Sequence, residues 1–151
     1  MRGVLLFIAR ALFSLPFIID GMGKLLDWPT ALAALNEALY NWQIYIESFG
    51  SVGFVGDVLQ YGVSKATFVV GAAILLEVVG GGLVLVSGCT TRVGISLLLI
   101  FSLLTTLIFH PFWLDIGEDF HIKVVLFSKN ISIAGLSLYL LIAPQKAKIA
   151  A

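Results

Sequence analysis

Four long apolar stretches constrain the fold of this chain more than any other feature of its sequence. They cover about residues 4–22, 67–86, 93–109 and 124–142. A helix needs about 20 predominantly apolar residues to cross a bilayer, and it satisfies its backbone hydrogen bonds internally, as the hydrocarbon requires. None of the stretches shows the two-residue alternation of a barrel strand. We therefore expect an all-α, polytopic membrane protein, with residues 1–151 forming a single domain built on a bundle of four transmembrane helices.

The composition supports this interpretation and excludes several other classes of protein. The chain is 60% hydrophobic and only 12% charged, whereas soluble domains are about 45–50% apolar and about 25% charged. Nine basic and nine acidic residues balance, so no overall positive charge favours nucleic acid. A single cysteine, Cys89, excludes an intramolecular disulfide and a C-x-x-C pair. No cysteine or carboxylate pattern accompanies His110 and His121, so we expect no metal site.

The basic residues predict how the chain is oriented in the membrane. Arg10 interrupts the first apolar stretch after only seven residues, so we interpret this stretch as a retained helix and not as a cleaved signal peptide. With the N-terminus in the cytoplasm, four basic residues lie inside and three near the outer face. The four are Arg2, Arg92, Lys146 and Lys148, and the three are Lys24, Lys65 and Lys123. This excess predicts that both termini are cytoplasmic.

The connection over residues 23–65 is too apolar to be a simple linker. A Trp-Pro-Thr sequence at Trp28 indicates a helix start, and apolar residues then recur at helical spacing. We expect an amphipathic helix at the outer interface between the first and second spans. Gly50, Gly53 and Gly56 predict that the following segment is broken into a mobile or re-entrant piece. An interfacial lid is favoured over a substrate-binding loop.

Four charged residues lie within the apolar stretches: Arg10, Asp20, Glu77 and Lys129. Such residues are costly in a membrane and are candidates for a functional site. Their depths predict an ion pair between Arg10 and Glu77 near the midplane. Asp20 should pair with Lys129, or with Lys24 four residues along its own helix. These pairs could fix helix register or bind a ligand, and the residues alone favour neither.

Glycines and polar residues mark the other spans. Gly80, Gly81 and Gly82 favour close packing of helices, although a flat groove beside Glu77 could also admit a ligand ring. His110 is a hydrogen-bonded helix end, or a proton donor or acceptor for a quinone. Asn130 needs a partner in the hydrocarbon and should face the bundle.

Short motifs also occur in a characteristic order along the four stretches. An arginine at Arg10 is followed by a glycine at Gly21 and by Lys24. Then come a glutamate–glycine segment from Glu77, a Phe-His-Pro-Phe-Trp helix ending at residues 109–113, and a Ser-Lys-Asn element at residues 128–130. This series resembles the DoxX-type membrane proteins. Asp20 and the long connection after the first span depart from the family pattern.

The resemblance implies a four-helix bundle in the bacterial inner membrane. Its motif residues are Arg10, Lys24, Glu77, His110, Lys129 and Asn130, and Asp20 joins them as a seventh candidate for ligand binding or ion pairing. The family takes its name from a subunit of a quinone-linked, sulfur-oxidising complex. The resemblance therefore implies a subunit of a membrane redox assembly that binds a quinone-like or other small apolar ligand.

An enzymatic role, if there is one, would be that of a non-autonomous subunit of a quinone-linked oxidoreductase. Redox proteins, and a second copy of the chain, are then the candidate partners besides the lipid bilayer. The alternative is a non-catalytic scaffold or assembly factor whose ion pairs are structural. Solute transport is a weaker hypothesis, because four short helices lack the inverted repeats common in transporters.

Overall fold

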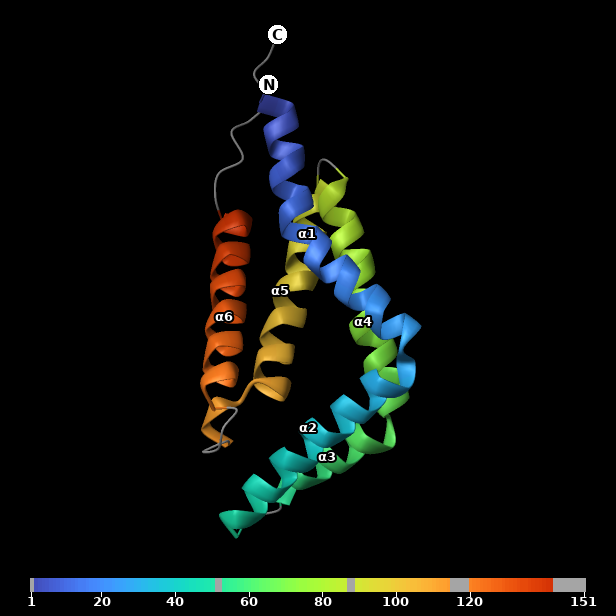
Figure 1. Cartoon of the computed structure of the whole chain (residues 1–151), viewed down its shortest axis with the longest axis vertical. Helices are drawn as coiled ribbons and strands as arrows, with labels where there is room; N and C mark the ends of the chain where they lie inside the picture. Colours follow the sequence, from blue (N-terminus) through green and yellow to red (C-terminus); the bar gives the residue numbers. More distant parts are fainter. Residues whose placement is uncertain (1, 51–52, 87–88, 115–119, 143–151) are drawn as a thin grey trace.

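The chain folds into helices joined by short connections (Figure 1). A computed structural model describes residues 2–50, 53–86, 89–114 and 120–142. Its elements are α1 (Arg2–Leu26), α2 (Trp28–Ser48), α3 (Gly53–Ser64), α4 (Ala66–Leu85), α5 (Cys89–Phe109), the 3₁₀ turn η1 (Phe112–Leu114) and α6 (Phe120–Ile142).

Among the described residues, four segments are long and apolar enough to cross a membrane, and they confirm the predicted spans. The segments are Gly3–Leu26, Ala66–Leu85, Cys89–Leu114 and Phe120–Ile142. Two of them begin about four residues before the predicted start. Arg92 lies in the first turn of α5, and Lys123 lies in the first turn of α6. Because the predicted stretches contain only the apolar residues after these charges, they start later than the helices. The chain is therefore an all-helical, multi-pass membrane protein.

Helix α4 is the centre of the packing, with α1 on one side and α5 on the other. Small residues make both approaches possible. A Cβ atom built on Gly81 would lie 2.6 Å from Ile18 of α1, and one built on Gly94 of α5 would lie 2.6 Å from the Gly80 carbonyl oxygen. The close packing predicted for the glycine run is thus present at Gly80 and Gly81, whereas Gly82 has open space around it.

The connection between the first two spans is a helical hairpin formed by α2 and α3. Helix α2 begins at the predicted residue, Trp28, and the Asp27 carboxylate accepts a hydrogen bond from the Thr30 N–H at 3.4 Å. The predicted break occurs at Gly50, which follows the end of α2 and has a φ of 74°. Gly53 and Gly56 do not break the chain as predicted, because residues 53–64 form a regular helix that begins at Gly53. Gly56 lies in its interior, where one glycine costs a helix only about 1 kcal/mol.

This hairpin crosses one end of the long helices (Figure 1), and we call that end the hairpin end. A buried apolar cluster joins the hairpin to α4; its buried members are Leu35, Leu39, Ala66, Val70 and Ile74. The Trp42 indole N–H also donates a hydrogen bond to the Leu107 carbonyl of α5 at 3.1 Å. The hairpin is therefore held to both α4 and α5 and covers the space between them.

Helix α6 occupies the edge of the bundle. It packs on α5 and on η1, where Phe127 contacts the rings of Phe112 and Trp113. In Figure 1, α6 and α5 run side by side, while α1 lies across α4. The flanks of α1 and α6 thus face each other across a groove, which forms part of the site described below.

Candidate functional site

The site is centred on an ammonium group held between two carboxylates. Lys24 Nζ lies 2.7 Å from Asp20 Oδ2 on the preceding turn of α1 and 2.7 Å from Glu77 Oε1 on α4. Glu77 is fully buried, whereas Asp20 is exposed. Two helices thus meet through one ion-paired group of three residues, which we call the Lys24 group.

The geometry corrects the predicted ion pair between Arg10 and Glu77. Gly21 lies against Glu77, and a Cβ built on Gly21 would lie only 3.0 Å from the Glu77 Cβ. This crossing places Lys24, one turn further along α1, within reach of Glu77. Side chains on a helix lean toward its N-terminus, so the long Lys24 side chain extends inward from the hairpin end. The depth estimate took no account of that reach.

The remaining intramembrane charges are not neutralised in this way. Of the two partners predicted for Asp20, Lys24 makes the contact and Lys129 does not. Within the described residues, neither Arg10 nor Lys129 forms an ion pair. The expected closed set of four balanced charges is therefore replaced by the Lys24 group and two unpaired basic side chains.

The Lys24 ammonium retains hydrogen-bonding capacity. It has three N–H donors, and in the described part of the chain two carboxylate oxygens are its only hydrogen-bond acceptors. The ammonium also lies 5.0 Å from the centroid of the Phe101 ring, at a distance where a cation is attracted to an aromatic face. One donor is thus free for a ligand at the edge of an apolar surface.

A cavity of about 460 Å³ opens beside Lys24, between α1, α2, α4 and α5. Most of its wall is aliphatic or aromatic, and small side chains such as Ala34 and Ala73 leave room in it. The few polar side chains in its wall belong to Asp20, Lys24, Thr105 and His110. A space of this size with apolar walls and a few convergent polar groups is typical of small-molecule sites.

Thr105 and Phe101 were not predicted as site residues. They lie one turn apart on α5 and both line this cavity. Their helical spacing, together with His110 at the end of the same helix, is the signal that could have identified them. The prediction considered charged residues within the spans and passed over a neutral hydroxyl.

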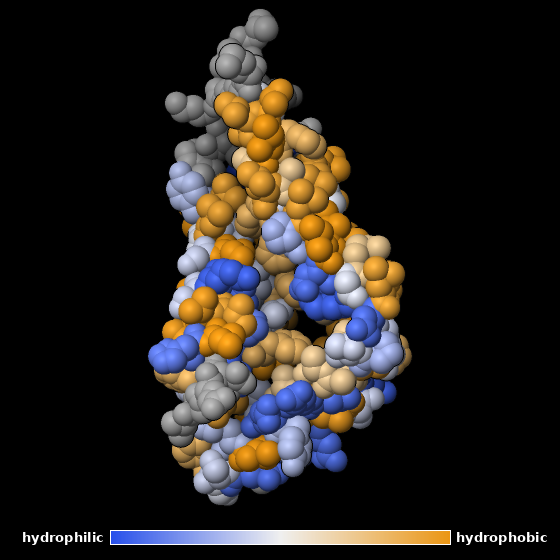
Figure 2. Space-filling view, in the orientation of Figure 1, coloured by the Kyte–Doolittle hydropathy of each residue, from blue (hydrophilic) through white to orange (hydrophobic). Residues whose placement is uncertain are grey.

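A second space, a groove of about 660 Å³, lies between α1, α5 and α6. It brings together four of the predicted residues, Asp20, His110, Lys129 and Asn130. Asn130 also lines this groove, but within the described residues its side chain has none of the hydrogen-bond partners expected for it. Arg10 and Glu77 line neither the groove nor the cavity beside Lys24. Figure 2 shows a hollow between α4 and α5, in the region of the cavity beside Lys24, with hydrophilic side chains at its border.

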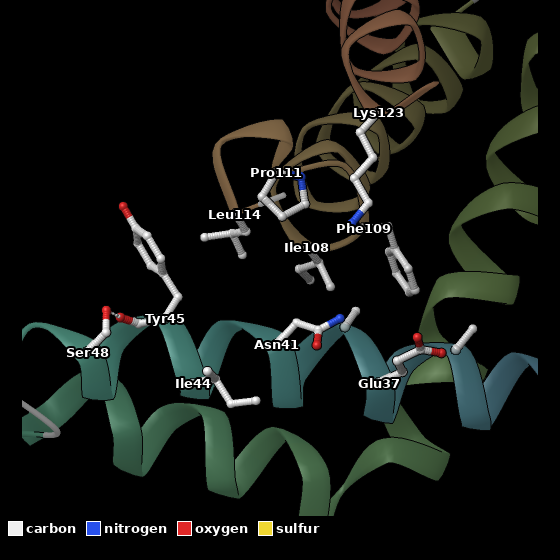
Figure 3. A pocket seen from close by; sticks show the side chains of 12 residues that line it. Glu37, Asn41, Ile44, Tyr45, Ser48, Ile108, Phe109, Pro111, Leu114 and Lys123 are labelled. Carbon is white, nitrogen blue, oxygen red and sulfur yellow. Dashed lines mark hydrogen bonds between the residues drawn. The ribbon is translucent and has the colours of Figure 1, made fainter. Parts of the chain in front are cut away.

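A third space, of about 610 Å³, lies between α2 and the end of α5, near the start of α6 (Figure 3). Glu37 and Asn41 point into it from α2, and Lys123 points into it from α6. Ile108 and Phe109 line both this space and the cavity beside Lys24. The third space and the cavity beside Lys24 are therefore adjacent, and α2 lines both.

Together these residues can bind a ring that carries hydrogen-bond acceptors. Lys24 and Thr105 can donate hydrogen bonds, His110 can donate or accept one, and the apolar walls can contact the ring. Among the described residues, no three His, Cys, Asp or Glu side chains are placed to hold a metal ion.

Comparison with known protein families gives a match to the DoxX family. Its profile matches residues 5–111, which include most of α1, all of α2 to α5, and the Lys24 group. No curated protein and no solved structure matches the chain.

Proposed function

The chain belongs to the DoxX family of membrane proteins, and from that premise we propose that it binds a quinone-like molecule in the cavity beside Lys24. In this proposal the protein is a membrane subunit of a redox assembly. The observation that carries the proposal is the free N–H donor of Lys24 at the wall of an apolar cavity of about 460 Å³. An unused donor in such surroundings is favourable for a ligand that brings a carbonyl acceptor.

The cavity residues suggest how the ring would be held. A quinone has a flat apolar ring with carbonyl oxygens on opposite sides, so it needs apolar walls and hydrogen-bond donors. Lys24 would donate to one carbonyl oxygen, and Phe101 would contact the ring. Thr105 or His110, on α5 and just beyond its end, would reach the other oxygen. Glu77 would not contact the quinone; its ion pair with Lys24 would hold the ammonium in place.

The chain would supply binding and orientation, and redox partner proteins would exchange electrons with the bound quinone. Any enzymatic activity would then be that of a non-autonomous subunit of a quinone-linked oxidoreductase. A homo-oligomer within such an assembly is compatible with the many apolar side chains on the outer surface of the helices.

We further propose that the protein resides in a bacterial inner membrane with both termini in the cytoplasm. The hairpin would then lie at the outer interface, with α2 as the predicted amphipathic helix. Cys89, which is exposed at the start of α5, provides a test. A membrane-impermeant maleimide should react with Cys89 in inverted vesicles, and with Tyr40→Cys in a Cys89→Ser background in intact spheroplasts. The opposite labelling pattern would reverse the orientation.

The ligand is tested by purification in a mild detergent, organic extraction and mass spectrometry. We expect the wild-type chain to carry an equimolar quinone. Ala34→Phe, which fills the cavity wall, should remove it, whereas Ala33→Phe should not, because Ala33 is exposed on the same helix and lines none of the three spaces. A wild-type protein without a quinone, and without affinity for an added one, would refute the proposal.

The alternative is a non-catalytic scaffold or assembly factor. One observation favours it: Glu77 is fully buried and already paired with Lys24, as in a structural ion pair. If the protein is a scaffold, Thr105→Val should leave cellular function intact, because it removes a cavity hydroxyl without changing the shape of the side chain. The quinone proposal predicts weaker quinone binding by the same variant, at unchanged thermal stability.

A further inference from the structure

The groove between α1 and α6 changes in polarity along its length. Its polar side chains lie in the half nearer the hairpin end: Asp20 on α1, Ser102 and Thr105 in the second half of α5, His110 after α5, and Lys129 with Asn130 in the first half of α6. Further from that end the wall is apolar, and on α1 it extends to Ala9. Ala9 precedes Asp20 by eleven residues, which corresponds to about 16 Å along a helix. The groove is therefore polar in the half nearer the hairpin end and apolar in the other half.

This groove adjoins the cavity beside Lys24. The side chains of Asp20, Phe101, Thr105 and His110 line both spaces. The polar end of the groove is thus the end at which the two spaces meet. A molecule with a polar ring and an apolar chain would match both spaces in this order.

The groove is open at its side, toward the lipid. Leu12 on α1 and Leu136 on α6 line it, and their exposed fractions are 70% and 48%. In a bilayer, a groove open at this depth is reached from the lipid phase. The apolar half of the groove offers no hydrogen-bond partners to a water-soluble ligand.

We propose that the ligand is a long-chain quinone taken from the plane of the membrane, with its ring beside Lys24 and its chain in the groove between α1 and α6. This inference rests on the proposed function and specifies its ligand class. Lipid chains are as apolar as the groove, so leaving the bilayer gives the chain little hydrophobic gain. The groove contributes through van der Waals packing along the chain, which depends on the shape of its walls.

The test uses two matched leucines on α6. Leu136 lines the groove, whereas Leu138 does not, and their exposed fractions are nearly equal, 48% and 47%. Purified Leu136→Trp, Leu138→Trp and wild-type proteins are titrated with a benzoquinone bearing a decyl chain and with the same ring without a chain. We expect Leu136→Trp to weaken binding of the decyl quinone about tenfold, and Leu138→Trp to leave it unchanged. The ring without a chain should bind all three proteins equally.

The outcomes separate this inference from the function on which it rests. If the wild-type protein binds both the decyl quinone and the ring without a chain, while Leu136→Trp weakens neither ligand or weakens both equally, the decyl chain does not lie in the groove. This inference is then refuted while the proposed function stands. If neither ring binds the wild-type protein, the proposed function fails and the inference falls with it. A change of oligomeric state in Leu136→Trp would assign the groove to a second copy and overturn the inference. Should Leu136→Trp not fold, Ala9→Phe, at the apolar end of the groove, takes its place with the same expectation.

Discussion

The unit formed by α1, α4 and α5 and the region around α6 are built differently. Helix α4 has seven buried residues and α6 has two, Ala134 and Ser137. Gly94 of α5 meets the α4 backbone so closely that its Cβ would lie 2.6 Å from an oxygen atom, whereas Gly135 of α6 has nothing within 4 Å. The first region is a tightly packed core, and the second is a helix set against its edge.

The treatment of charge follows the same division. In the core, Glu77 is fully buried and has an ionic partner 2.7 Å away. On α6, Lys129 is exposed toward a groove and forms no ion pair within the described residues. In the tightly packed core, the buried charge of Glu77 is accompanied by its ionic partner. At the loosely packed edge, the charge of Lys129 is exposed and can interact with a ligand. In the proposed function, the core would hold the quinone ring and the edge would leave space for its alkyl chain.

Removing the basic partner of Glu77 should reveal this difference most clearly. Lys24→Met leaves a buried, unpaired carboxylate, and breaking a buried pair in this way costs about 3–5 kcal/mol. Lys129→Met, on α6, should change the free energy of unfolding by less than about 0.5 kcal/mol. Both are measured by reversible unfolding in mixed micelles.

The double variant Lys24→Met/Glu77→Met provides the control, because it removes both charges and should recover most of the loss. Equal destabilisation by Lys24→Met and Lys129→Met would show that the two regions do not differ in their tolerance of a missing charge.

The two glycines give a second test with the same chemical change. Gly94→Ala forces its new methyl group against the Gly80 carbonyl and the Val84 N–H, and backbone atoms cannot move aside as a flexible side chain can. We expect a destabilisation of about 1–3 kcal/mol. Gly135→Ala meets open space in an exposed helix interior and should stabilise the protein by up to about 1 kcal/mol. The thermal midpoints of the two variants should therefore shift in opposite directions, and shifts in the same direction would contradict the packing described.

The smallest effect is expected where the hairpin meets α5. Trp42→Phe removes the hydrogen bond to the Leu107 carbonyl, which is worth about 1 kcal/mol. We expect faster hydrogen exchange of the α2 amides, with exchange in α4 unchanged. Tyr40→Phe is the control on the same helix, because Tyr40 is exposed and its hydroxyl forms no hydrogen bond within the described residues. Exchange that rises equally in α2 and α4 would mean that the hairpin and the core open together.

Much of the fold could be predicted from the sequence, because hydrophobicity in a membrane protein reports directly on its surroundings. The four spans needed only a count of apolar residues, and the start of α2 needed only the Trp-Pro-Thr signal that begins at Trp28. The course of the chain after Gly50 could not be predicted this way. Three glycines suggest a break, but packing of α3 against α2 and α4 outweighs the weak helix propensity of Gly56.

The charged residues of the Lys24 group can be identified from the sequence, but their contacts cannot. Arg10 and Glu77 were paired by depth along two upright helices, whereas the actual partner follows from the point where α1 crosses α4. That point is set by Gly21, which lets the two backbones approach. A single sequence carries no measure of where two helices cross, so the ion pair between Lys24 and Glu77 could not be distinguished from its alternatives. Phe101 and Thr105 were missed for the same reason, since only the packing of α5 turns them toward Lys24.

The position of α6 at the end of the described chain has a consequence for biogenesis. A ribosome delivers α1, α4 and α5 to the membrane before α6, and protein domains assemble in the order of synthesis. The ion pair between Lys24 and Glu77 and the contact between Gly80 and Gly94 need only the helices that arrive first. The last helix then docks on α5 and completes the second wall of the groove. The groove is therefore complete only once α6 has inserted.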